Sequence, residues 1–132
     1  MKSTFIACLA LISLTLSGCA STDYNLTSLA GINVRDLEAA KDQGRSRTFE
    51  MGYEDAFNRT IAVLEREKLT TFRSSKRKGY IVAMGFPEQI DTTRVGIFFD
   101  AVSENSTEIT LSSLSGTAVS KAENIIFSGL AD

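Results

Sequence analysis

The sequence predicts an α+β fold: a single small domain at residues 45–132, with an antiparallel sheet of about five strands and two helices packed on one face, in the order β-α-β-β-β-β-α. Three observations predict it. Polar and larger side chains alternate along residues 46–51, apolar side chains recur at three- and four-residue steps over 53–67, and β-type runs separated by polar turns fill 69–113. Helices on one face of an antiparallel sheet bury both kinds of apolar stripe.

The first predicted element is a short helix that begins at Asn33, whose side chain suits an N-cap, and ends near Gly44. A strand at 46–51 follows. Gly52 then separates this strand from the strongest helical pattern, which predicts a helix at 53–67 with acidic residues in its first turn. Its expected buried stripe is Tyr53, Phe57, Thr60, Ile61 and Leu64, with Ala56 and Val63 beside it.

Two hairpins and a helix complete the domain. Residues 69–72 and 80–84 form the first hairpin around a polar loop that ends at Gly79, and residues 92–102 and 107–113 form the second. Alternation places Val95, Ile97 and Phe99 on the face that meets the helices. Ser120 and Glu123 have the spacing of a capping box, which predicts a last helix at 121–131.

The amino-terminal segment has the pattern of a secretory signal. Lys2 supplies a positive charge, residues 5–16 are uncharged and mainly apolar, and the run ends at Leu16-Ser17-Gly18-Cys19. The apolar run is too short to span a hydrocarbon layer about 30 Å thick as a permanent helix. An uncleaved interfacial helix is the alternative, but the small Gly18 before Cys19 favours cleavage between them.

Leu16-Ser17-Gly18-Cys19 resembles the lipobox of bacterial lipoproteins. The resemblance implies a signal peptide at 1–18, cleavage before Cys19, and acyl chains on the Cys19 thiol that anchor the protein in a membrane. Two or more chains anchor a protein stably, whereas one does so only marginally. Residues 19–44 then form a lipidated tether with a short helix, and 45–132 form a periplasmic domain. Ala20 stands where an aspartate would favour retention in the inner membrane, which implies the outer membrane.

Composition excludes several kinds of chemistry. Removing residues 1–18 from the 132-residue chain leaves 114 residues with no histidine, and Cys8 departs with the leader while Cys19 carries the lipid. The folded part therefore lacks the side chains for Ser-His or Cys-His catalysis, disulfides and common zinc sites. The net charge is −2, and loss of Lys2 makes it one unit more negative, which argues against nucleic-acid binding. We expect no metal and no cofactor.

Residues 48–85 resemble a repeating module of the C subunit of the β-barrel assembly machine, a small outer-membrane lipoprotein. The resemblance rests on the helix YEDAFNRTIAVLERE and the following LTTFRSSKRKGYIVA, in which a Lys-Gly-aromatic sequence opens the second hairpin strand. Several families of small bacterial lipoproteins share this core. The chain has one such module, where that subunit has two, and it lacks that subunit's long amino-terminal binding segment. The resemblance therefore implies a fold and an envelope location.

Two features are candidate binding sites. Arg73, Lys76, Arg77 and Lys78 concentrate positive charge in the first hairpin, which suits anionic lipid, glycan carboxylates or an acidic partner. The alternative is a solvated hairpin tip. Phe98 lies on the sheet face opposite Phe99, where an apolar patch would mark an interface with a partner protein and a lone exposed aromatic would not.

The remaining question is catalysis. Glu88, Asp91, Asp100 and Glu104 are the carboxylates nearest the loops, and paired carboxylates can hydrolyse glycosides, but nothing in their spacing sets two at a catalytic separation. We therefore expect a protein that is not an enzyme: a lipid-anchored envelope lipoprotein that binds a protein or envelope component. The alternative is a glycan- or lipid-binding module that uses the basic hairpin Arg73–Lys78.

Overall fold

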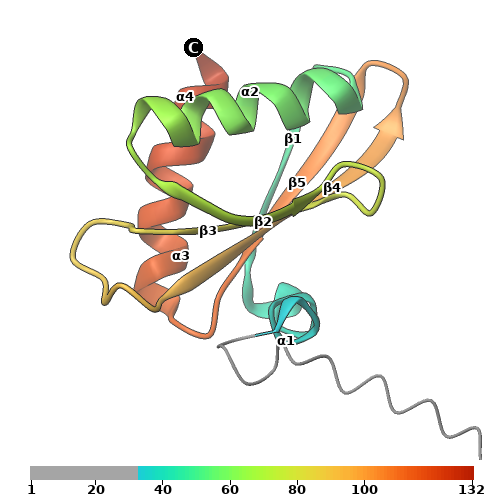
Figure 1. Cartoon of the computed structure of the whole chain (residues 1–132). Helices are drawn as coiled ribbons and strands as arrows, with labels where there is room; N and C mark the ends of the chain where they lie inside the picture. Colours follow the sequence, from blue (N-terminus) through green and yellow to red (C-terminus); the bar gives the residue numbers. More distant parts are fainter. Residues whose placement is uncertain (1–32) are drawn as a thin grey trace, which may run out of the picture.

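The computed structural model of the chain describes residues 33–132 (Figure 1). The predicted signal peptide, the cleavage site at Gly18 and Cys19, and the lipid attachment to Cys19 lie outside the described residues. Within them, no helix is both long and apolar enough to cross a membrane.

The predicted five-stranded antiparallel sheet is confirmed. Its spatial order is β1-β5-β4-β3-β2, and every neighbouring pair is antiparallel. Strands β2 to β5 follow each other across the sheet, and β1 is added beyond β5. The chain must therefore cross from one edge of the sheet to the other between β1 and β2, and helix α2 makes this crossing. The strands are β1 (Arg45–Phe49), β2 (Thr70–Ser75), β3 (Tyr80–Met84), β4 (Arg94–Ser103) and β5 (Ser106–Ser112).

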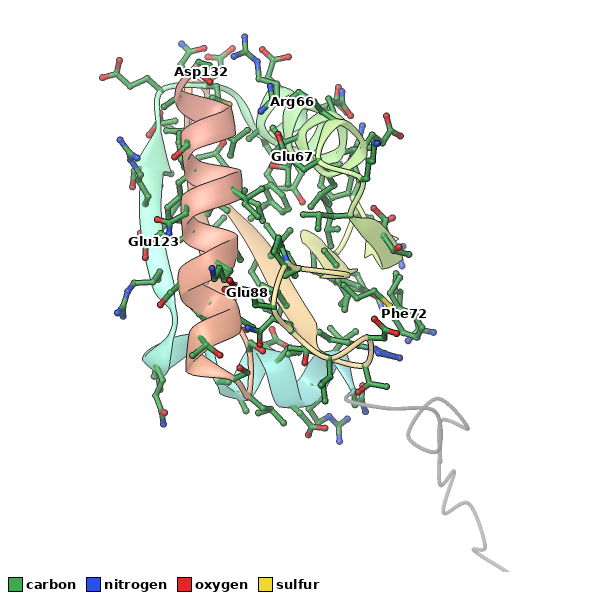
Figure 2. All side chains as sticks on the ribbon, turned by 90° about the vertical axis from the view of Figure 1, so that its left-hand side faces the viewer. Arg66, Glu67, Phe72, Glu88, Glu123 and Asp132 are labelled. Carbon is green, nitrogen blue, oxygen red and sulfur yellow. The ribbon has the colours of Figure 1, made fainter. Side chains whose placement is uncertain are left out.

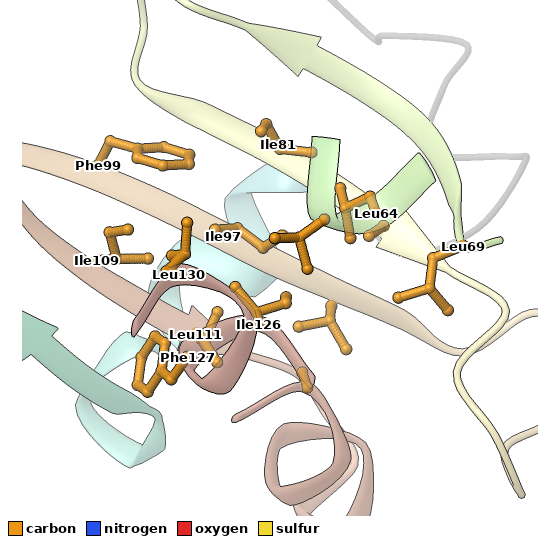
Figure 3. Packing of buried hydrophobic residues seen from close by; sticks show 14 of the residues in the cluster. Leu64, Leu69, Ile81, Ile97, Phe99, Ile109, Leu111, Ile126, Phe127 and Leu130 are labelled. Atoms are coloured by element: carbon orange, nitrogen blue, oxygen red, sulfur yellow. The ribbon is translucent and has the colours of Figure 1, made fainter. Parts of the chain in front are cut away.

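The inner face of the sheet, which carries Val95, Ile97 and Phe99, is covered by two helical elements, as predicted. One is α2 (Tyr53–Arg66). The other is the C-terminal helical segment, which consists of α3 (Gly116–Ala122), the π-helical turn η3 (Glu123–Phe127) and α4 (Ser128–Ala131). Figure 3 shows Leu64, Ile126 and Leu130 of these helices packed against Ile97 and other strand residues. This layer is the main hydrophobic core.

The buried stripe of α2 differs slightly from the predicted one. Ala56 and Val63, expected at its margins, are buried, whereas Tyr53 and Ile61 are half-buried. Thr60 is fully buried, and its hydroxyl donates to the carbonyl of Ala56 at 2.8 Å. This hydrogen bond within the helix satisfies the one polar group of the stripe.

The outer face of the sheet, which carries Phe98, is partly covered by α1 (Val34–Ala39), on the side opposite α2 (Figure 1). The predicted N-cap is present: the Asn33 side chain accepts from the Arg35 amide, and Asp36 accepts from the Asn33 amide. Leu37 packs against Val82 and Phe98, and the Ser112 hydroxyl donates to the Leu37 carbonyl at 2.5 Å. A 3₁₀ turn, η2 (Lys41–Gln43), leads into Gly44 and then β1.

Several predicted boundaries shift by one or two residues, and two shift by more. The last helix begins at Gly116, because Ser115 is its N-cap and accepts from the Ala118 amide at 3.3 Å. Ser120 therefore lies inside the helix and donates to the Gly116 carbonyl, although its spacing from Glu123 matches a capping box. The first hairpin loop is also shorter than predicted, because β2 continues to Ser75. Arg73 consequently belongs to a strand and not to the hairpin tip.

Candidate functional site

Phe98 lies on the predicted face of the sheet, but the exposed surface expected there is absent. Its side chain is 5% exposed, because α1 packs over it through Leu37. The close approach of α1 depends on Gly96: a Cβ atom at that position would lie 3.1 Å from the Leu37 Cβ and 2.6 Å from the Phe98 ring. Phe98 is thus part of an intramolecular contact, which corrects the expectation that it presents an apolar patch to a partner.

The four basic residues of the first hairpin do not form one patch. Lys76 turns toward α2, where its Nζ atom lies 3.0 Å from the Asn58 side-chain oxygen and 3.7 Å from the Glu54 carboxylate. The same atom lies 5.6 Å from the centre of the Phe57 ring. Arg77 is exposed at the turn. Lys76 therefore helps to hold the hairpin against α2.

Arg73 and Lys78 lie on the other side of the hairpin, where they line a hollow of about 280 Å³ on the outer face. We call this the outer hollow. Tyr80 and Phe98 belong to neighbouring strands and face each other in the β3–β4 register. Helix α1 supplies the remaining wall. Among residues 33–132, its lining is Asn33, Val34, Glu38, Arg73, Lys78, Tyr80 and Phe98.

A β-bulge puts Arg73 into the outer hollow. Thr71 pairs with Ala83, and Arg73 pairs with Val82, so the register shifts by one residue at Phe72. In a regular strand Thr71 and Arg73 would share a face, because successive side chains alternate. The extra residue moves Arg73 to the face of Val82 and Phe98.

The hairpin turn that carries Lys78 is held by specific contacts. Gly79 has a φ of +73°, and a Cβ atom there would lie 2.8 Å from the Phe99 carbonyl oxygen and 2.9 Å from the Tyr53 hydroxyl. That hydroxyl donates to the Lys76 carbonyl at 2.5 Å. Burial, and secondarily the negative charge of Asp100, raise the pKa of Tyr53, so the phenol keeps its proton and remains a donor. The turn is thereby fixed to the start of α2.

The charges around the outer hollow favour an anion. Arg73 and Lys78 bring two positive charges to it, and Glu38 brings one negative charge. Close by, Lys41 lies 3.6 Å from Asp100, with its Nζ atom 5.0 Å from the centre of the Phe98 ring, so this pair is compensated. Arginine and lysine donors beside aromatic rings suit a carboxylate or phosphate that carries a small apolar group.

Sequence reasoning missed Tyr80 and the α1 residues of the outer hollow. Tyr80 follows Gly79 directly, and its strand pairs with that of Phe98. A correct pairing register would have placed Tyr80 beside Phe98, but the sequence does not specify that register. Asn33, Val34 and Glu38 were predicted only as a helix start, with no indication of which face of the sheet the helix covers.

The four loop carboxylates are dispersed. Glu88 pairs with Lys121 at 2.5 Å, and hydrogen bonding to this lysine, followed by its charge, lowers the Glu88 pKa. Asp100 pairs with Lys41 on the opposite face. Asp91 is exposed between β3 and β4, and Glu104 is exposed in the turn between β4 and β5. Among residues 33–132, no group of three or more acidic, histidine or cysteine side chains could hold a metal ion.

Comparison of the chain with models of known protein families and with curated proteins finds no match.

Proposed function

We propose that this protein is a lipid-anchored, non-catalytic lipoprotein of the bacterial envelope, held in the outer membrane, whose periplasmic domain binds an anionic envelope component in the outer hollow. The anchor is acyl chains on Cys19, after removal of residues 1–18. The ligand carries a carboxylate or phosphate beside a small apolar group. A headgroup phosphate of a lipid and a peptide carboxylate of the cell-wall glycan share this chemistry.

The observation that carries the binding proposal is the convergence of Arg73, Lys78 and Phe98 on one hollow. Arg73 lies on β2, Lys78 on the turn between β2 and β3, and Phe98 on β4. Tyr80 adds a second ring and a hydroxyl. Two cations that converge on one hollow, beside the ring and hydroxyl of Tyr80, favour an anionic ligand, whereas a solvated loop would leave its cations dispersed.

The observation that supports the anchor is the leader itself, with its basic start, uncharged apolar run and Leu16-Ser17-Gly18-Cys19 exit. Mass spectrometry of membrane-extracted protein is expected to show a mature chain that starts at Cys19 and carries acyl chains. Cys19→Ser should leave an unmodified precursor. A mature amino terminus elsewhere, or acylation of the Cys19→Ser chain, would refute the anchor without affecting the binding proposal.

The binding proposal is tested with small water-soluble probes, because an acylated protein inserts into any vesicle. Isothermal titration of the full-length protein in neutral detergent would use glycerol phosphate as the lipid-headgroup probe and a muramyl peptide with free carboxylates as the glycan probe. At least one should bind, and its affinity should fall with added salt as the two cations are screened. The stronger probe identifies the source of the anion.

The variant for this test is Arg73→Gln with Lys78→Gln, and its matched control is Arg59→Gln with Arg77→Gln. Both pairs remove two positive charges, but Arg59 and Arg77 do not line the outer hollow. We expect the first pair to weaken binding at least tenfold and the control pair to bind as the parent does. Equal loss in both pairs would indicate a general charge effect, and no binding of either probe would reject the site.

A further inference from the structure

The two edges of the sheet differ in how they meet solvent. Within residues 33–132, β1 pairs with β5 alone, in regular register over all five of its residues, and Arg45 to Thr48 are exposed. The opposite edge strand, β2, is interrupted by its bulge at Phe72. A regular edge strand presents a row of backbone donors and acceptors to solvent, whereas a bulge disrupts that row. The β1 edge is therefore the better template for another strand.

A second hollow, of about 360 Å³, lies along β1. Its walls are Ser46 and Arg47 of the strand and Glu123, Asn124, Phe127 and Ser128 of the C-terminal helical segment. Figure 2 shows β1 running beside this helical segment, which carries the labelled Glu123. An added strand would lie about 4.8 Å from β1, and every second side chain would point toward the helix. The hollow provides space for those side chains beside Asn124 and Ser128.

The charges of this edge select the occupant. Arg45 and Arg47 lie on the inner face, because they pair with Leu111 and Ile109. Arg45 forms an ion pair with Glu123 at 3.5 Å, whereas the Arg47 guanidinium lies 5.4 Å from the centre of the Phe49 ring. Contact with a ring uses the flat face of a guanidinium and leaves its N–H groups directed outward, where a carboxylate can accept from them.

A second copy of this chain suits the edge less well than an acidic segment does. An antiparallel pairing of two β1 strands centred on Arg47 would place the two Arg47 side chains opposite each other, and like charges directly opposite destabilise a strand pair. β1 has two arginines and no acidic residue among its five positions. Complementary charge therefore requires acidic side chains at alternate positions of the incoming strand.

We propose that β1 accepts an extended acidic segment of a partner protein as a sixth strand, with an acidic side chain of that segment bound to Arg47 in the hollow beside the C-terminal helical segment. This interaction is separate from the outer hollow, because β1 and β2 are opposite edges of the sheet. Main-chain hydrogen bonds would supply affinity, and the alternate side chains would supply specificity.

The test uses the full-length protein in neutral detergent and a fluorescent seven-residue peptide with glutamate at alternate positions and threonine or valine between them. Two further peptides carry backbone N-methyl groups, one on the odd-numbered and one on the even-numbered residues. A peptide added as a strand uses only one of these sets of N–H groups toward β1. One methylated peptide should therefore lose at least tenfold in affinity while the other keeps most of it.

The variant Arg47→Glu should weaken binding of the unmethylated peptide at least tenfold, whereas the matched charge reversal Arg59→Glu on α2 should leave it within twofold of the parent. Hydrogen exchange should show amides of β1 gaining protection when the peptide binds. Equal affinities of the two methylated peptides, unchanged binding by Arg47→Glu, or β1 amides fully protected before any peptide is added would each overturn the proposal.

Arg73→Gln with Lys78→Gln separates this proposal from the proposed function. That pair should abolish probe binding in the outer hollow and leave peptide binding to β1 within twofold of the parent. A loss of peptide binding in this variant would show that the peptide occupies the outer hollow, which would reject the β1 site.

Discussion

The two faces of the sheet differ in what covers them. On the inner face, α2 and the C-terminal helical segment bury a continuous apolar cluster that includes side chains from all five strands or their ends. On the outer face, the six-residue helix α1 covers a cluster that, within residues 33–132, holds three buried apolar side chains, Leu37, Val82 and Phe98. Beside this small cluster the surface is concave and lined by charged groups.

The difference shows how one sheet can separate stability from recognition. Burial of apolar area stabilises a fold in proportion to the area removed from water, so the inner face dominates the free energy of folding. The outer face has a short cover that leaves its margin open, and the bulge in β2 directs Arg73 to that margin. A binding site beside a rigid layer keeps its geometry because that layer supports it, although the site itself adds little to the stability of the fold.

The largest expected effect is on the inner face. Phe57 is 6% exposed, and its ring centre lies 5.1 Å from that of Phe99. Phe57→Ala should lower the free energy of unfolding by about 3–5 kcal/mol, as measured by urea denaturation, because a large side chain leaves a packed core. Ile90→Ala, at a position 74% exposed, is the control and should have little effect. If Phe57→Ala unfolds at the same urea concentration as the parent, the assignment of Phe57 to the buried inner face is wrong.

On the outer face, the corresponding change should be smaller and local. Leu37→Ala removes the side chain that joins α1 to Val82 and Phe98, and we expect a loss of about 2 kcal/mol, at the low end for a buried leucine because α1 can move. Hydrogen exchange should accelerate in α1 while β4 keeps its protection, since local openings can occur below the global free energy. If β4 and α1 lose protection equally, the two faces unfold as one cooperative unit, and the outer face does not open separately from the inner face.

A smaller effect tests where the helix over the inner face begins. Ser115→Ala removes the N-cap of α3 and should cost about 1 kcal/mol in the free energy of unfolding. Ser120→Ala is the matched control: Ser120 is exposed inside the helix, and its replacement should change stability by about 0.5 kcal/mol or less. A larger loss of stability in Ser120→Ala than in Ser115→Ala would instead indicate that Ser120 caps the helix.

The smallest expected effect is on the exposed ion pair between Glu88 and Lys121. Lys121 lowers the pKa of Glu88, so the ion pair contributes stability above the ordinary glutamate pKa, and this contribution is lost as pH falls through the lowered pKa. Glu88→Gln should therefore lower the melting temperature slightly at neutral pH, and this difference should disappear as the pH falls through the lowered pKa, because protonated Glu88 carries the same charge as glutamine. A melting difference that persists in acid would show that packing, and not charge, is responsible.

Much of the fold could be predicted because its signals are local. The alternation along β4 assigned Val95 and Ile97 to one face and Phe98 to the other, and all three are placed accordingly. The helical spacing around Phe57 and the cap at Asn33 were also informative, because each depends on neighbours within four residues. The site was predicted only in part: Arg73, Lys78 and Phe98 line one hollow, whereas Lys76 is held by α2.

The sequence by itself determined the order of the elements, the side of β4 that is apolar, and the absence of histidine and of cysteine beyond Cys19. Only the tertiary structure decided that α1 covers Phe98, that a bulge turns Arg73 to the outer face, and that β1 becomes an edge strand. The physical reason is the distance along the chain over which each kind of interaction acts. Periodicity and caps act between residues close along the chain, whereas register, bulges and the choice of face depend on partners that are distant in sequence and meet only when the sheet has formed.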